Sequence, residues 1–285
     1  MRVVNDGLPL PLYAAVSQER EPREGYSISQ LVNSTPQQHA LKLAHDAEIE
    51  EPASSRIWAA MGTAMHLLLS QHGAGLDGHI VEERLHTVID GVPISGQFDV
   101  LADGVVGDWK FVGVASTFNG VKPEHALQVR LYAYLLHVNG FDCHKGQVTY
   151  IYRDWMQSRA KDHDYPPQVQ TFDVPLWEDS WVESWLKLRI VSFQAAEAGY
   201  YDDCTPEETW QRPTQYAVTK FGNKRAARLL PSFDEATAWA IANTPANREP
   251  TSWFELVERP GADVRCESYC NVSAWCAQRA RRLEE

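Results

Sequence analysis

The chain has 285 residues, of which 44% are hydrophobic, enough to bury a large core in one elaborated domain or one domain with a small appendage. No stretch approaches the roughly 18 apolar residues of a membrane-spanning helix, and the first residues lack the pattern of a secretory signal, so we expect a cytoplasmic protein without a membrane partner. The net charge of −12 argues weakly against a nucleic-acid partner. However, the acidic excess lies in residues 1–204, and carboxylates that bind a metal add acid without repelling phosphate.

The N-terminal part of the chain predicts an arm followed by three helices. Residues 1–25 are polar and contain several prolines, which favours an extended arm. A short helix is expected from Ser29, and Thr35 followed by Pro36 is typical of an N-cap and first turn that open a second helix. The segment 54–71 has apolar residues at helical spacing and predicts a third helix. One face of this helix is apolar: Trp58, Met61, Met65 and Leu69.

Two Asp–Gly pairs, Asp90–Gly91 and Asp103–Gly104, lie between runs of alternating apolar residues. Both residue types tolerate the positive φ of a type I′ turn, so each pair predicts a β-hairpin. The strands that these turns join are expected at 79–88, 92–102 and 105–114. The next elements are expected to be a helix, two strands and a tryptophan-rich helix, at 123–140, 146–155, 168–175 and 177–198.

The second hairpin, in the segment FDVLADGVVGDWK, places two acids opposite each other. With a two-residue loop, Ala102 faces Val105, and counting outward along both strands brings Asp99 opposite Asp108. Directly opposed residues share a face of the sheet, with Cβ atoms about 5 Å apart, and Lys110 lies on the face of Asp108 by the period of two. Two like charges at this distance are unfavourable unless a positive group lies between them. The segment therefore predicts two carboxylates and an ammonium group that converge on one point.

Further polar side chains are expected near this point. His66 lies on the helix that precedes the strands, and Gln128 and Tyr132 share one face of the helix that follows them, because they are four residues apart. Glu82 and Glu83 are adjacent on the first strand, so at most one of them faces the site.

Each of these residues also has a simpler interpretation. Asp99 and Asp108 could flank an ordinary surface hairpin, although their apolar neighbours indicate a buried sheet, in which unpaired acids are costly. His66 could be a hydrogen-bonded core histidine. Gln128 and Tyr132 could belong to the helix surface and its packing. Residue by residue, the simpler interpretation is favoured, so the choice depends on the pattern as a whole.

Four motifs follow one another between residues 62 and 132: GTAMH, SGQFDV, DWK and QVRLY. This pattern resembles the RecB-like branch of the PD-(D/E)XK nuclease superfamily, whose motifs are G-x-x-x-H, G-x-x-D, D-x-K and Q-x-x-x-Y. Each motif alone is weak, but four in order on the expected elements favour the functional interpretation. The resemblance implies an α/β (α+β) fold of the restriction-endonuclease type, in which helices flank a mixed central sheet. It divides the chain into an arm (1–25), a nuclease core (26–200) and a C-terminal extension (201–285) that packs on the core.

The resemblance also implies roles for individual residues. It implies ligands for a divalent metal: His66, Asp99, Asp108 and the backbone carbonyl of Trp109. Lys110 is implied to orient or activate the attacking water and to stabilise charge on the phosphate, and Gln128 and Tyr132 to position the substrate or this lysine. Hard oxygen ligands suit Mg²⁺ or Mn²⁺, and an imidazole shifts the preference towards Mn²⁺.

Three of the five cysteines crowd near the C-terminus: Cys266, Cys270 and Cys276. Without a secretory signal, clustered cysteines indicate metal rather than disulfides. In iron–sulfur members of the family, a similar trio joins one cysteine early in the chain, but Ser34 and Thr35 stand at that place here. Cys204 is then the best candidate for the fourth ligand, whereas Cys143 is expected to be buried and inert.

Four thiolates can hold either a 4Fe-4S cluster or a tetrahedral Zn²⁺. The resemblance favours the iron–sulfur cluster, and zinc sites more often consist of two close cysteine pairs. Three reduced structural cysteines are a third alternative, which is less favoured because thiols at this density oxidise unless they are ligated. From about residue 205 the chain is expected to be irregular, apart from one helix at 232–243, so the cluster would act as a structural staple.

The span 209–233 contains no acid and several basic residues. Aromatic residues lie among them: Trp210, Tyr216 and Phe221. This mixture suits single-stranded nucleic acid, because bases stack on rings while cations follow the phosphates. A solvated loop is an equally good interpretation. The predicted nucleic-acid-binding residues are Lys220, Lys224, Arg225 and Arg228.

These observations predict a metal-dependent DNA exonuclease that acts on single strands or DNA ends in recombination- or repair-type processing. Two alternatives stay open: a structure-selective endonuclease on the same core, and a cluster-containing DNA-binding subunit without activity. The intact Asp108 and Lys110 argue against the second alternative. The sequence leaves the oligomeric state open.

Overall fold

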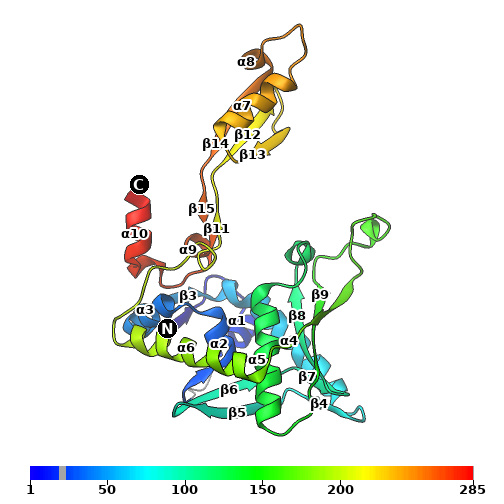
Figure 1. Cartoon of the computed structure of the whole chain (residues 1–285), viewed down its shortest axis with the longest axis vertical. Helices are drawn as coiled ribbons and strands as arrows, with labels where there is room; N and C mark the ends of the chain where they lie inside the picture. Colours follow the sequence, from blue (N-terminus) through cyan, green and yellow to red (C-terminus); the bar gives the residue numbers. More distant parts are fainter. Residues whose placement is uncertain (19–23, 285) are drawn as a thin grey trace. The chain divides into compact units, whose positions relative to one another are not determined.

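A computed structural model of the chain describes residues 1–18 and 24–284. The chain forms two compact units, Met1–Tyr201 and Asp202–Glu285. Figure 1 shows the helices and strands of both units. Among the described residues, no helix combines the length and the apolar character that a membrane crossing requires.

The first unit is a mixed α/β structure, as predicted. Its larger sheet contains β4 (His79–Val81), β7 (Val100–Ala102), β8 (Val105–Val112), β9 (Lys145–Tyr152) and β10 (Val169–Val174). These strands have the order β10-β9-β8-β7-β4, in which only β8 and β9 are parallel. Its smaller sheet contains β2 (Tyr26–Ser27), β5 (Arg84–Ile89) and β6 (Val92–Gln97), in the order β2-β6-β5.

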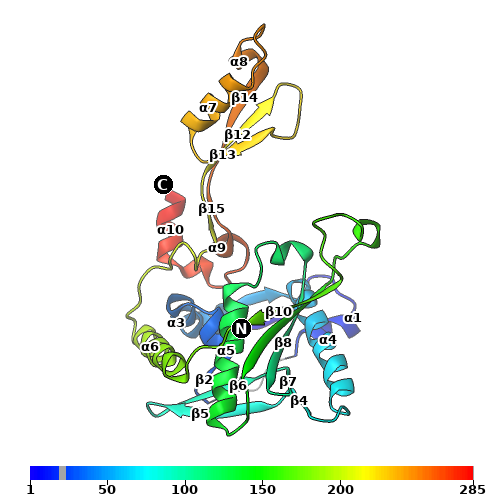
Figure 2. The ribbon, with the colours of Figure 1, turned by 45° about the vertical axis from the view of Figure 1, so that its right-hand side comes forward.

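Helices cover both sides of the larger sheet (Figure 2). Helix α5 (Pro123–Val138) connects the parallel strands β8 and β9, which require such a crossover. Helix α4 (Ile57–Gly73) contacts β8 from the other side. Helix α6 (Asp179–Glu197) packs on α5 and on α3 (Pro36–His45). The buried core draws on the larger sheet and on α5 and α6: Val106, Val129, Leu131, Leu135, Val148, Leu186 and Phe193.

Both predicted hairpin turns are confirmed. Asp103–Gly104 has φ values of 50° and 72°, as a type I′ turn requires, and Ala102 pairs with Val105. The pair Asp90–Gly91, with φ values of 49° and 81°, closes the hairpin of β5 and β6 in the same way.

The strands predicted at 79–88 and 92–102 are each broken in two, which corrects the expectation of two long strands. Segment 79–88 forms β4 in the larger sheet and then β5 in the smaller one. Segment 92–102 forms β6 in the smaller sheet and then β7 in the larger one. The two breaks lie side by side: the N–H of Glu82 donates to the carbonyl of Asp99 (3.0 Å), and that of Phe98 to the carbonyl of Glu83 (3.3 Å). At the first break Glu82 adopts a left-handed φ of 52°, which turns the chain out of one sheet.

The N-terminal segment is more ordered than the predicted extended arm. Strand β1 (Arg2–Val4) pairs in parallel with β3 (Glu50–Pro52), and α1 (Leu10–Val16) follows. Residues 19–23 of the predicted arm lie outside the described residues. The two short helices are α2 (Ile28–Asn33) and α3, and the Thr35 hydroxyl caps α3 as predicted by accepting from the N–H of Gln38 (3.0 Å).

The second unit contains a sheet that the sequence analysis missed, so the expectation of an irregular segment is wrong. Strands β12 (Gln215–Lys220), β13 (Arg228–Leu230) and β14 (Phe254–Arg259) form an antiparallel sheet in the order β13-β12-β14. Helix α7 (Phe233–Ala242), which was predicted, packs on one face of this sheet. The buried residues between them are Val218, Ala236, Ala240 and Phe254.

A two-stranded ladder closes this sheet–helix structure at its base. Strand β11 (Gln211–Arg212) pairs with β15 (Ala262–Asp263) in antiparallel register. We call residues 211–263 the inserted module, because Cys204 precedes it and the cysteine trio follows it in sequence. Helix α8 (Pro250–Trp253) belongs to the module, and α9 (Val264–Ser268) and α10 (Ala277–Glu284) follow it.

Candidate metal-dependent active site

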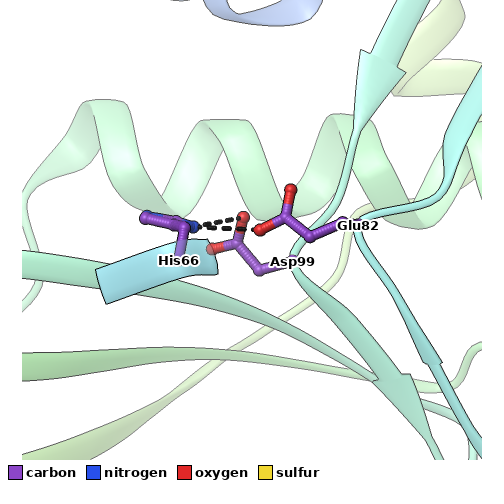
Figure 3. A group of neighbouring side chains, drawn as sticks. All are labelled: His66, Glu82 and Asp99. Carbon is purple, nitrogen blue, oxygen red and sulfur yellow. Dashed lines mark hydrogen bonds and ion pairs between the residues drawn. The ribbon is translucent and has the colours of Figure 1, made fainter. Parts of the chain in front are cut away.

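Three side chains from different elements meet where the two strand pairs break. His66 comes from α4, Glu82 from the β4–β5 junction and Asp99 from the β6–β7 junction. The imidazole Nδ1 lies 3.3 Å from Oε1 of Glu82 and 3.2 Å from Oδ1 of Asp99. Figure 3 shows the imidazole facing both carboxylates. The paired breaks therefore bring two acids to one imidazole.

The scaffold fixes the outer oxygen of each of these carboxylates. Oδ2 of Asp99 accepts from the backbone N–H of Trp109 at 2.5 Å. This hydrogen bond takes the place of a ladder hydrogen bond, because β7 begins only at Val100 and does not extend to residue 99. Oε2 of Glu82 accepts from Nε2 of Gln97 at 2.6 Å, and Arg84 donates to Oε1 of Gln97 at 2.6 Å. Each acid is thus oriented by a second group, as metal-binding carboxylates commonly are.

The donor set fits a divalent cation. Hydrogen bonds to Asp99 and then to Glu82 raise the pKa of His66 to about 10, so a proton on the imidazole balances the two acids. One ligand atom from each of these residues lies within 4.8 Å of the other two. Two carboxylates and an imidazole are ligands that Mn²⁺ and Mg²⁺ accept, and an ion can take over the positive charge that the proton now supplies.

A second group of polar side chains runs from β8 to α5. Lys110 Nζ donates to Oδ1 of Asp108 at 2.9 Å and to Oε1 of Gln128 at 3.2 Å. Nε2 of Gln128 donates in turn to the hydroxyl of Tyr132 at 2.6 Å. The carboxylate, the amide and the ring are buried, whereas 19% of the lysine side chain is exposed. The ammonium group is therefore held on two sides, at the end of a partly exposed side chain.

Asp108 belongs electrostatically to both groups of side chains. Burial raises the pKa of Asp108 to about 6; Lys110 and His66 oppose this effect, while the charge of Asp99 adds to it. Its Oδ2 forms an ion pair with Lys110 Nζ at 2.7 Å. A buried carboxylate is costly unless it is paired, and Lys110 supplies that pairing here.

The structure brings the predicted ligands His66 and Asp99 together and adds Glu82. The sequence offered Glu82 and Glu83 as alternatives, and only Glu82 joins the group, because its left-handed φ directs the chain there. No local sequence signal distinguishes the two acids, since the turn depends on the partner strand.

The other predicted roles stay predictions. Asp108 lies beside Lys110, and its predicted role as a metal ligand stays a prediction. The predicted role of the Trp109 carbonyl also stays a prediction; the backbone N–H of the same residue donates to Asp99. The predicted positioning roles of Gln128 and Tyr132 are consistent with their hydrogen bonds to each other and to the lysine.

The four predicted cluster cysteines share one neighbourhood in the second unit. Burial, the thiol of Cys270 and further nearby acids and thiols, including those of Cys204 and Cys276, raise the pKa of Cys266 to about 11. Gln278 fastens Cys204 to α10, because its side chain exchanges two hydrogen bonds (2.9 and 2.8 Å) with the backbone of Cys204. Cys143 is buried in the first unit, as expected.

The predicted basic residues separate into two groups in the structure. Lys220 packs its ammonium group 3.9 Å from the ring of Trp253. Lys224, Arg225 and Arg228 instead line a groove of about 670 Å³, together with Arg259, which the sequence analysis had not singled out.

No protein-family model matches this sequence, and no curated protein matches it. Solved structures with a similar arrangement include the following three. The protein SSO0001 is 16% identical, with a TM-score of 0.43 over 63% of this chain and 81% of that chain. An alkaline exonuclease from Laribacter hongkongensis is 14% identical, with a TM-score of 0.40 over 67% and 94%. A phage-related exonuclease from Haemophilus somnus 129PT is 16% identical, with a TM-score of 0.32 over 48% and 70%.

Proposed function

We propose that this chain is a divalent-metal-dependent deoxyribonuclease, and specifically an exonuclease that hydrolyses single-stranded DNA or DNA ends in recombination- or repair-type processing. The observation that supports this most strongly is the convergence of His66, Glu82 and Asp99 beside a buried Asp108 and a partly exposed Lys110. An ordinary surface hairpin needs no imidazole between two acids and no carboxylate as deeply buried as that of Asp108.

The metal shell in this proposal consists of side chains and one carbonyl: His66, Glu82, Asp99, Asp108 and the backbone carbonyl of Trp109. A bound Mg²⁺ or Mn²⁺ supplies Lewis-acid chemistry, which polarises a phosphoryl oxygen and lowers the pKa of water.

The remaining side chains supply fixed positive charge. Lys110 provides an ammonium group where negative charge grows on the phosphate during the reaction. Gln128 holds the ammonium through its Oε1, and Tyr132 holds the amide, so the lysine is oriented before the substrate arrives. Burial, followed by the charge of Asp108, raises the pKa of Tyr132, so its hydroxyl stays protonated.

The test uses the full chain with Mn²⁺ or Mg²⁺ and three DNA substrates: end-labelled single strands, end-labelled duplexes and circles. We expect digestion of linear DNA and survival of the circles. Cleavage of circles would favour a structure-selective endonuclease, and binding without any cleavage would favour a DNA-binding subunit. Cleavage that persists in Asp108→Ala would refute the proposed site.

The second unit is proposed to hold a 4Fe-4S cluster on four thiolates: Cys204, Cys266, Cys270 and Cys276. A tetrahedral Zn²⁺ with Zn–S bonds of about 2.3 Å needs thiolates about 3.8 Å apart. Within the described residues, no three of these sulfurs lie within 4.8 Å of one another. A cluster of four irons accepts wider spacing, because each thiolate binds a different iron. Anaerobically purified protein should show a broad visible absorption band and contain iron and sulfide, whereas zinc alone would give no such band.

A further inference from the structure

The basic groove lies between the loop that joins β12 to β13, the start of β13 and Arg259 of β14. Alternation along the strands places Val218, Leu256 and Leu230 on the face that packs against α7. Leu229 and Arg259 belong to the opposite face, whereas Arg228, which pairs with Val218 at the sheet edge, belongs to the face of α7. The loop that joins β12 to β13 forms one wall of the groove.

Four cations line this groove, and no acid lies among its lining residues: Lys224, Arg225, Arg228 and Arg259. Within the described part of the chain, no ion pair is recorded for any of the four. Glu255 shares the face of Arg259, but it lies at the other end of β14 and does not line the groove. In a protein with a net charge of −12, such a concentration of free positive charge favours an anionic ligand.

The number of cations and the neighbouring apolar groups favour a polyanion whose bases are unstacked. Four separate cations match successive phosphates along one strand better than a single phosphate ion. Phe221 opens the same loop and is 54% exposed, and Leu229, which lines the groove, is 42% exposed. Exposed rings and apolar side chains beside cations suit the unpaired bases of a single strand. In a duplex the bases are stacked inside and cannot reach such side chains.

We propose that the inserted module is a binding site for single-stranded DNA, in which the four groove cations follow the phosphates and Phe221 stacks on a base. Lys220 is excluded from this site, because its ammonium group packs on Trp253. The biological role rests on the proposed nuclease function: the module gives the enzyme a second hold on the strand being degraded. The binding itself does not depend on cleavage.

The test is fluorescence anisotropy of the full chain with labelled dT30 and a labelled 30-base-pair duplex, without added metal, over a range of salt concentrations. The quadruple change Lys224→Gln/Arg225→Gln/Arg228→Gln/Arg259→Gln should weaken dT30 binding at least about tenfold. It should also reduce the slope of log affinity against log salt by about 2.8, because each phosphate contact on a single strand contributes about 0.7.

A matched pair of variants separates the groove from general charge. Lys224→Gln/Arg225→Gln should reduce the salt slope by about 1.4, whereas Lys42→Gln/Lys161→Gln, which removes two exposed charges of the first unit, should leave it unchanged. Phe221→Ala should weaken dT30 binding severalfold without changing the slope.

Unchanged dT30 affinity and slope in a folded quadruple variant would overturn the proposal, and tighter binding to the duplex than to dT30 would overturn the single-strand assignment. Arg259→Glu, a single exchange, serves if the quadruple variant does not fold. Cleavage in Mn²⁺ is measured separately, so failure of the nuclease proposal and failure of this one give different results.

Discussion

The two units of the chain relate their folds to their candidate metal sites in opposite ways. In the first unit, buried apolar side chains from sheets and helices form a large core, and the polar site is attached to it. In the second unit, the inserted module has a small buried core, and the cysteines lie on short helices and turns outside that core. We infer that the first unit places its ligands through its fold, whereas the end of the second unit depends on its ligands for its fold.

The largest expected effect is a loss of cleavage activity without a loss of folding stability. Asp108→Asn keeps the shape of a buried side chain but loses its negative charge, and we expect cleavage to fall by at least about a thousandfold. Thermal unfolding should be unchanged or shifted to higher temperature, because a desolvated charge is removed. Single-turnover cleavage and calorimetry check the two parts, and a large loss of stability would contradict the comparison.

The opposite behaviour is expected for a cysteine of the second unit. Cys270→Ser should remove the visible absorption and the iron, and it should make residues 202–285 sensitive to protease, because ligand binding there contributes directly to folding. Cys143→Ala is the matched control, since Cys143 lies in the first unit and should leave the spectrum intact. Limited proteolysis followed by mass spectrometry locates the cut sites. Retained iron in Cys270→Ser would remove this residue from the ligand set.

A smaller effect is expected from a residue that acts through Lys110. Gln128→Ala frees the ammonium group on one side, and we expect kcat to fall about tenfold to a hundredfold with little change in KM. Tyr132→Phe should lower kcat less than Gln128→Ala does, because it removes only the hydroxyl that orients Gln128 and leaves Gln128 bonded to Lys110. Steady-state cleavage of labelled DNA separates kcat from KM, and an effect on KM alone would assign Gln128 to substrate binding.

Two adjacent acids give a sharper comparison within the first unit. Glu82→Gln should weaken Mn²⁺ binding about tenfold or more, whereas Glu83→Gln should leave it unchanged, because only Glu82 faces His66. Titration calorimetry with Mn²⁺ measures both. Equal effects of the two substitutions would show that the turn at Glu82 does not select the ligand.

The smallest effect concerns the hairpin turn. Gly104 has a φ of 72°, and a Cβ there would meet the ring of His144. Gly104→Ala should therefore destabilise the first unit by about 1 kcal/mol while leaving the visible absorption of the second unit intact. Urea unfolding followed by fluorescence measures the first effect, and a parallel loss of absorption would show that the two units do not respond separately.

Local signals in the sequence predicted much of this structure. The Asp103–Gly104 turn fixed the register that brings Asp99 towards β8, and helical spacing located α4, α5 and α6. Strand breaks were missed, because the alternation of 79–88 and 92–102 continues through the point where each strand changes sheets. That change depends on pairing between the two segments.

The sheet of the second unit was missed for a similar reason. Strand β12 and its partner β14 are separated in sequence by β13, α7 and α8, so no hairpin signal joins them. Lys220 was predicted to bind nucleic acid because of its neighbours in sequence. In the folded module its ammonium group instead packs on Trp253, which is distant in sequence.

The most direct test of the central claim is a crystal of the protein soaked in Mn²⁺ and measured with X-rays that reveal manganese by anomalous scattering. We predict one strong peak within coordination distance of His66, Glu82 and Asp99, with Asp108 on its inner side, and loss of this peak in Asp99→Asn. A peak elsewhere, or no peak while the imidazole stays bonded to both carboxylates, would contradict the account.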